Sequence, residues 1–154
     1  SVQLRAKQKM ARIYGIREGQ FRKYYKESTR IQGVSGENLL RLLEGRLDNV
    51  VFRLGLAPSR KAARQLVRHN HFTVNGRRVN IPSYMASPGD VISVAEGSRQ
   101  LEVIQESMRR SRELVPWLTV DKANLVGTVS DRPNRGDIPT PVEEQLVIEF
   151  YSRV

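Results

Sequence analysis

The amino-acid sequence predicts an α+β protein, in which a basic helical N-terminal region precedes a unit of two helices and a hairpin, with an antiparallel sheet. In the first half of the chain, apolar residues recur at steps of three and four, which is typical of amphipathic helices. In the second half, short β-branched segments alternate with turn signals such as Asn75-Gly76 and Pro88-Gly89-Asp90. The 154 residues allow one domain or two small ones.

Residues 1–45 are predicted to form a basic helical domain, which C-terminal residues could join. Val2 to Tyr14 form one predicted helix, Gly15 ends it, and residues 19–28 form a second. The aromatic residues of the second helix share one side and are expected to be core, namely Phe21, Tyr24 and Tyr25. Residues 1–30 carry nine Lys and Arg against two Glu, a net charge of +7 that counterions or phosphates would neutralise.

Residues 46–115 are predicted to form the central unit and the helix that follows it. An apolar stripe from Leu39 to Leu54 predicts one long helix that begins before this unit and closes at Gly55. A second helix is expected from the N-cap Ser59 to about Asn70. Its apolar side holds Ala63, Leu66 and Val67, and its other side holds Arg60, Arg64 and Arg68 with Lys61 beside them. Like charges at this spacing disfavour an isolated helix by roughly 0.2 to 0.5 kcal/mol per pair, a cost that a partner of opposite sign would offset.

A hairpin is predicted over residues 72–79, because the type I′ turn requires positive φ twice and Asn75-Gly76 supplies it. Trp117 is expected to be a core anchor. Further strands are predicted at 91–94, 116–120, 125–129 and 145–151, with a helix at 99–114 and a loop at 130–141. Residues 116–154 would complete the sheet or return to the N-terminal domain.

The net charge of +10 and the pI near 10.5 indicate a polyanionic partner. Charge alone leaves RNA, DNA and an anionic membrane open, but no apolar run approaches the ~18 residues of a membrane span. The sequence has no cysteine, no phosphate-binding glycine loop and no Ser-His-Asp arrangement, and its two histidines have no ligand partners at metal-site spacing. We therefore expect a binding protein without cofactor, metal or small-molecule substrate.

Three stretches carry a family resemblance: KQKMARIYGIREGQFRKYY, the run from GENLLRLLEGRLDNVV to SYMASPGDVI, and VEEQLVIEFYSR. They resemble small-subunit ribosomal protein number four, here called S-four, and residues 46–94 resemble its RNA-binding module. Asn70 stands where the family suggests glycine, and Asn tolerates the left-handed conformation well. Relatives carry an extra N-terminal segment, so this sequence is interpreted as N-terminally truncated.

The resemblance implies primary binding to the 5′ domain of small-subunit ribosomal RNA, nucleation of subunit assembly, and neighbouring ribosomal proteins as partners. It also implies a place near the path by which messenger RNA enters, with the protein's own messenger RNA as a candidate repression target. A cytoplasmic ribosome is expected, and an organellar one stays open. The expected RNA contacts are Arg46, Arg53, Arg60, Lys61, Arg64, Arg68, Arg77 and Arg78, with a second patch of Lys7, Lys9, Arg12, Arg22 and Lys23.

Two alternatives remain. Arg46-Leu47-Asp48 resembles the motif of pseudouridine synthases, whose aspartate is the nucleophile, but Asp48 lies within a predicted amphipathic helix and is expected to be a structural partner of a nearby arginine or backbone group. The other alternative is a free-standing binder of tRNA or of a dissociated large subunit, which would use the same module.

Overall fold

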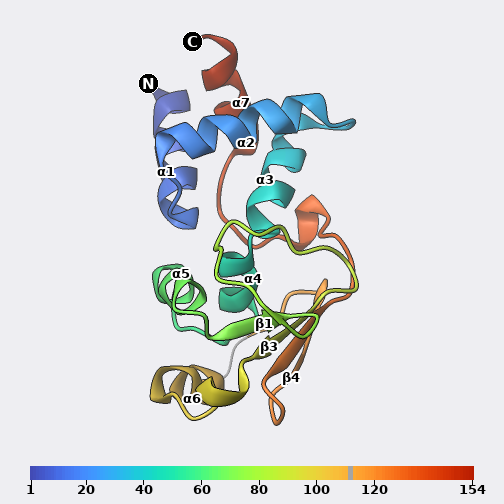
Figure 1. Cartoon of the computed structure of the whole chain (residues 1–154). Coiled ribbons are helices and arrows are strands. Elements are labelled where there is room, and N and C mark those ends of the chain that lie inside the picture. Colours follow the sequence, from blue (N-terminus) through green and yellow to red (C-terminus); the bar gives the residue numbers. More distant parts are fainter. Residues whose placement is uncertain (111–112) are drawn as a thin grey trace. The chain divides into compact units, whose positions relative to one another are not determined.

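The computed structural model describes residues 1–110 and 113–154, and it divides into two compact units (Figure 1). Unit 1 comprises residues 1–44 and 134–154, and unit 2 comprises residues 45–133. The described residues form helices and an antiparallel five-stranded sheet, so the α+β prediction is confirmed. No helix in the described ranges is both long enough and apolar enough to cross a membrane.

Unit 1 is helical and is closed by the end of the chain. Its helices are α1 (Val2–Tyr14), α2 (Glu18–Arg30), α3 (Ser35–Glu44) and α7 (Glu144–Ser152), with a short 3₁₀ turn, η2 (Arg135–Asp137). Helix α1 packs against α7, α2 packs against α3, and α3 also packs against α7. Ser1 caps α1 by accepting the Leu4 N–H at 3.2 Å, and Gly15 ends it at φ 68°, as the sequence predicted.

The predicted strand at residues 145–151 is wrong, because this segment is helix α7. Val147 and Tyr151, four residues apart, are the two buried side chains of the helix, so its apolar face follows a helical period. A short apolar run fits a strand and a buried helix equally well by composition. Packing against α1 and α3 decides in favour of the helix here.

A buried polar cluster joins the two chain segments of unit 1. The Tyr14 hydroxyl donates to Glu44 Oε2 at 2.6 Å and lies 2.9 Å from Thr140 Oγ1. All three side chains are at most 5% exposed, and satisfied polar groups at this depth specify one arrangement of the segments they join.

Unit 2 holds α4 (Leu47–Arg53), α5 (Arg60–Arg68), η1 (Glu96–Ser98) and α6 (Glu102–Arg109). The single long helix predicted through Leu54 is wrong, because α3 ends at Glu44 and α4 begins only at Leu47. The Leu47 N–H donates to the Tyr84 carbonyl at 2.8 Å, and the Asp48 N–H donates to the Pro82 carbonyl at 3.2 Å. These amides bond to a distant loop rather than to a preceding helical turn, which explains the break. The helix predicted at 99–114 is the shorter α6, and residues 111–112 of that prediction lie outside the described residues.

The sheet has the strand order β2-β1-β3-β5-β4, and every neighbouring pair is antiparallel. The predicted hairpin and the strands predicted at 91–94, 116–120 and 125–129 are confirmed, with Asn75 at φ 53° and Gly76 at φ 83° in the turn. Trp117, 4% exposed, belongs to the core as expected. The strand bounds are Phe72–Val74 (β1), Arg77–Arg78 (β2), Val91–Val94 (β3), Leu118–Asp121 (β4) and Val126–Val129 (β5).

Candidate nucleic-acid interface

Helix α5 is amphipathic: one face is apolar and buried, and the other carries a row of cations. Ser59 caps the helix, because its hydroxyl accepts the Ala62 N–H at 3.1 Å. Ala63, Leu66 and Val67 are buried, as predicted, while Lys61 and Arg68 are exposed. The amphipathic pattern therefore fixes which side of α5 is basic.

The carboxylate of Asp48 binds two arginines from different parts of unit 2. Arg46 donates from Nε to Asp48 Oδ1 at 3.1 Å and from Nη2 to Oδ2 at 3.0 Å, and Arg64 donates from Nε to Oδ2 at 3.0 Å. The Asn49 N–H donates to Oδ1 at 2.7 Å. The side chains of Arg46 and Asp48 are 3% and 2% exposed, whereas that of Arg64 is 23% exposed. Asp48 is thus a structural partner of arginines and of the backbone, as expected, and its buried carboxylate is not presented to a substrate.

The neighbouring Asn49 holds a second arginine of α5. Arg60 donates from Nε to Asn49 Oδ1 at 2.8 Å, and its guanidinium carbon lies 4.6 Å from the centre of the Phe52 ring. Asn49 is 1% exposed. Consecutive residues at the start of α4 therefore fix two arginines that stand one turn apart on α5.

The hairpin carries Arg77 and Arg78, both exposed, on β2. Its turn is braced by Asn75, whose Oδ1 accepts the Val91 N–H at 2.8 Å and whose Nδ2 donates to Asp90 Oδ1 at 2.9 Å. These contacts connect the turn to the beginning of β3, so the two guanidinium groups follow an anchored turn. The cations of α5 and of the hairpin are together called the unit 2 patch, which comprises Arg60, Lys61, Arg64, Arg68, Arg77 and Arg78.

Two histidines lie near the hairpin. His71 Nδ1 is 2.7 Å from Ser98 Oγ, and the rings of His69 and His71 are 6.3 Å apart. Partial burial lowers the pKa of His71, and the charges of His69 and Arg78 lower it further. Within the described part of the chain, no group of three or more His, Asp or Glu could hold a metal ion.

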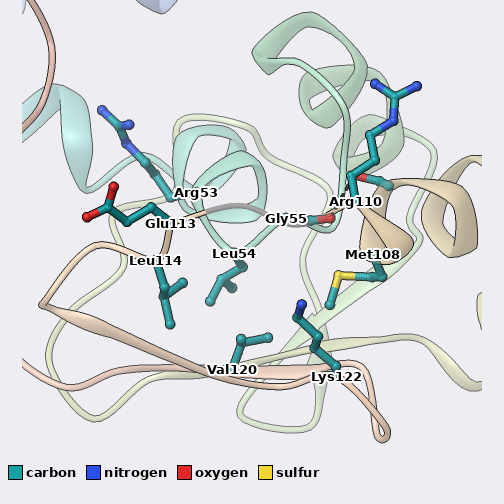
Figure 2. A pocket seen from close by; sticks show the side chains of 10 residues that line it. Arg53, Leu54, Gly55, Met108, Arg110, Glu113, Leu114, Val120 and Lys122 are labelled. Carbon is teal, nitrogen blue, oxygen red and sulfur yellow. Dashed lines mark hydrogen bonds between the residues drawn. The ribbon is translucent and has the colours of Figure 1, made fainter.

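Arg53 belongs to α4 rather than α5 and lines a pocket of about 60 Å³ that Figure 2 shows from close by. Leu54, Met108, Leu114 and Val120 point into the space, whereas Arg53 extends away from it.

The predicted cations of unit 1 differ in exposure. Lys9, Arg12, Arg22 and Lys23 are exposed on α1 and α2. Lys7 is 14% exposed, forms an ion pair with Glu18 at 3.3 Å, and lies 5.7 Å from the centre of the Phe150 ring. Arg5, which was not among the expected contacts, lines the same shallow groove as Lys9 and Arg12.

The structure brings the expected contact residues together only in part. Arg60, Lys61, Arg64 and Arg68 share helix α5, and Arg77 and Arg78 share the hairpin. Arg46 is buried rather than on the surface, and Arg53 and Lys7 are half-buried. Asn49 was not found from the sequence, because a buried amide within a helix carries no signal of its contacts.

Two families match adjoining parts of this chain. Residues 1–44 match the Ribosomal protein S4/S9 N-terminal domain, and residues 45–92 match the S4 domain. The matches meet between Glu44 and Gly45, where the structure also divides its units.

Curated relatives match nearly the whole chain. Small ribosomal subunit protein uS4 of Syntrophobacter fumaroxidans is 55% identical over 154 residues, which is 99% of this chain and 74% of the relative. The proteins of the same name from Thermus thermophilus and Acidothermus cellulolyticus are 56% and 58% identical, again over 99% of this chain and 74% of each relative. The chain therefore belongs to the family of small ribosomal subunit protein uS4.

Proposed function

We propose that this chain is a structural component of the small ribosomal subunit that binds ribosomal RNA through the unit 2 patch. The observation that carries the proposal is the α5 face, where Arg64 and Arg60 are held by buried side chains while the helix also presents Lys61 and Arg68. Fixed guanidinium groups suit phosphate oxygens, since they offer donors in a planar fork.

The overall charge supports a polyanion as the partner. Unit 2 carries 14 Lys and Arg against 8 Asp and Glu, and residues 46–94 within it carry 8 against 2. The basic excess of unit 2 is thus concentrated where the hairpin and α5 lie. Neutralised phosphates release counterions, which makes such binding strong at low salt.

The exposed cations of unit 1 form a second proposed contact surface, which comprises Lys9, Arg12, Arg22 and Lys23. Lys7 would support it from beside Glu18, and Arg53 would add a contact at the edge of unit 2. Arg46 is proposed to act through its ion pair with Asp48 rather than by touching phosphate, because it is 3% exposed.

The finer role follows the family. We propose binding to the 5′ domain of small-subunit ribosomal RNA early in assembly, contacts with neighbouring ribosomal proteins, and a place near the path of messenger RNA in a cytoplasmic ribosome. Repression of its own messenger RNA is part of this proposal. The role is structural rather than catalytic.

Filter binding tests the proposal, with small-subunit ribosomal RNA and an equal mass of tRNA compared across a salt series. We expect selective binding to the ribosomal RNA that weakens steeply with salt. Arg64→Ala and Arg68→Ala should each lower the slope of log affinity against log salt by about 1. Equal affinity for both RNAs would contradict the selective role.

Arg109→Ala is the matched control. It removes the same charge from unit 2, but Arg109 lies on α6 and pairs with Glu102 at 3.2 Å and Glu106 at 2.6 Å. The affinity and the salt slope should stay at their wild-type values. An equal loss in all three variants would show that only net charge matters.

A further inference from the structure

We infer that Asp48 and Asn49 are positioning residues for RNA binding, which hold Arg64 and Arg60 in the orientation that receives phosphate. The inference rests on the proposed function. Both residues lie in the first turn of α4, both are almost fully buried, and each accepts a hydrogen bond from the Nε of one α5 arginine. Two adjacent side chains therefore order two cations of the proposed interface.

The charges around Asp48 suit this role. A carboxylate that paired with Arg64 alone would cancel the charge that attracts phosphate. Arg46, buried beside Asp48, supplies a second positive charge at 3.0 Å, so the group of three keeps a net charge of +1. Arg64 is half-buried and is the most exposed member of the group, so it carries that charge toward solvent.

The atom that makes each contact also matters. Nε is the guanidinium nitrogen nearest the main chain, so a hydrogen bond there fixes the plane of the group while the side chain of Arg64 keeps 23% exposure. Arg60 is fixed in the same way, and its packing on Phe52 adds a second restraint. Lysine has no such nitrogen, so this arrangement requires arginine.

Arginine side chains that are already ordered in the free protein raise the affinity for RNA, because fewer side-chain rotamers are then lost on binding. An arginine side chain that is already held loses less entropy when it meets a phosphate. The buried acceptors Asp48 and Asn49 would thus raise RNA affinity without touching RNA.

Asp48→Asn gives a test in which charge and positioning predict opposite signs. Removing a negative charge beside a polyanion should tighten binding by about twofold if only electrostatics acts. Loss of the charge-assisted contact should instead weaken binding by about tenfold. The measurement is filter binding to small-subunit ribosomal RNA across a salt series, with wild-type chain alongside.

Asp121→Asn is the matched control, since Asp121 is an exposed carboxylate at the end of β4 in the same unit. It removes the same charge and should leave affinity unchanged or slightly higher. If Asp48→Asn behaves like Asp121→Asn, the inference is overturned.

A double-mutant cycle separates positioning from general stabilisation. In an Arg64→Ala background, Asp48→Asn should no longer weaken binding, because the side chain through which it acts is absent. A loss that persists in that background would mean that Asp48 acts through the fold, which would overturn the inference. The proposed function has a separate test: it would be refuted if the wild-type chain bound small-subunit ribosomal RNA no more tightly than tRNA.

A variant of Asn49 provides a second test, which applies even if Asp48→Asn does not fold. Asn49→Ala changes no charge, so weaker binding that disappears in an Arg60→Ala background supports positioning. If Asn49→Ala bound RNA as tightly as the wild-type chain, the inference that Asn49 positions Arg60 would be contradicted. NMR of the free variants would report the same contacts, since the Nε–H signals of Arg60 and Arg64 should lose their protection from exchange.

Discussion

Gly127→Ala is predicted to destabilise unit 2 through one side chain. Gly127 lies on β5 opposite Ile92 and Val120, and a Cβ at this position would lie 2.4, 2.5 and 2.9 Å from Cδ2, Cδ1 and Cγ of Leu54. Carbon atoms in proteins pack at about 3.5 to 4.0 Å, so the leucine must move by about 1 Å. Leu54 directly follows α4, the helix that carries Asp48 and Asn49.

The cost follows from this overlap. Overpacking of a core by one carbon typically destabilises by about 1–3 kcal/mol. We expect about 2 kcal/mol, because Cγ as well as the methyl groups must shift, while the small pocket beside Leu54 gives it some room (Figure 2). Leu54→Ala alone should cost about 2–5 kcal/mol through the cavity that it leaves.

Urea denaturation followed by Trp117 fluorescence measures the effect, since the sole tryptophan is buried in unit 2. In the double variant the new methyl group fills space vacated by Leu54, so the two costs should fall short of additive by about 1–3 kcal/mol. Gly97→Ala, with no atom within 4 Å of the new Cβ, is the control and should change stability by less than about 0.5 kcal/mol. Additive costs, or a neutral Gly127→Ala, would refute the reasoning.

Two further predictions concern buried polar groups. Tyr14→Phe should destabilise unit 1 by about 1–3 kcal/mol in urea denaturation followed by circular dichroism, because Glu44 and Thr140 lose a buried partner; an unchanged midpoint would contradict this. His71 has a pKa below its usual 6.5 in the folded protein, so the unfolded state binds the proton more tightly and the free energy of unfolding should fall as pH decreases from about 7.5 to about 5.5. His71→Gln should show a smaller fall, and an identical pH profile would assign the effect to other groups.

Local features of the fold were predictable from the sequence. Gly15, Ser59 and Asn75-Gly76 act through their own backbone or through amides within three residues, so their residue types were sufficient to place helix ends and the hairpin turn. The apolar side of α5 was equally predictable, because a helical period needs no information from the rest of the chain.

Distant contacts were not predictable in the same way. Apolar residues keep their helical spacing across Gly45 and Arg46, from Leu43 to Leu47. Hydrogen bonds from the Leu47 and Asp48 amides to residues 84 and 82 accompany the break between the two helices. The helical state of α7 likewise depends on its packing against α1 and α3.

The candidate site likewise has features that were predictable from the sequence and features that depend on distant contacts. Charge and spacing identified Arg64 and Arg68 as members of one basic face. They could not show that Arg46 is buried, since an arginine beside an aspartate in sequence is usually a surface pair. Which cations are held and by which acceptors depends on how α4 meets α5.

The order of segments in unit 1 affects how the protein folds during synthesis. Unit 2 is one continuous stretch, so it can complete its core as soon as residue 133 has left the translating ribosome. The basic helices α1 and α2 are made before unit 2, yet their own unit lacks Thr140 and Tyr151 until the residues after unit 2 have been made. Unit 1 therefore completes its core later than unit 2 does, although its helices α1 and α2 are made earlier. A partly translated chain thus exposes a strongly basic segment before that segment has a core.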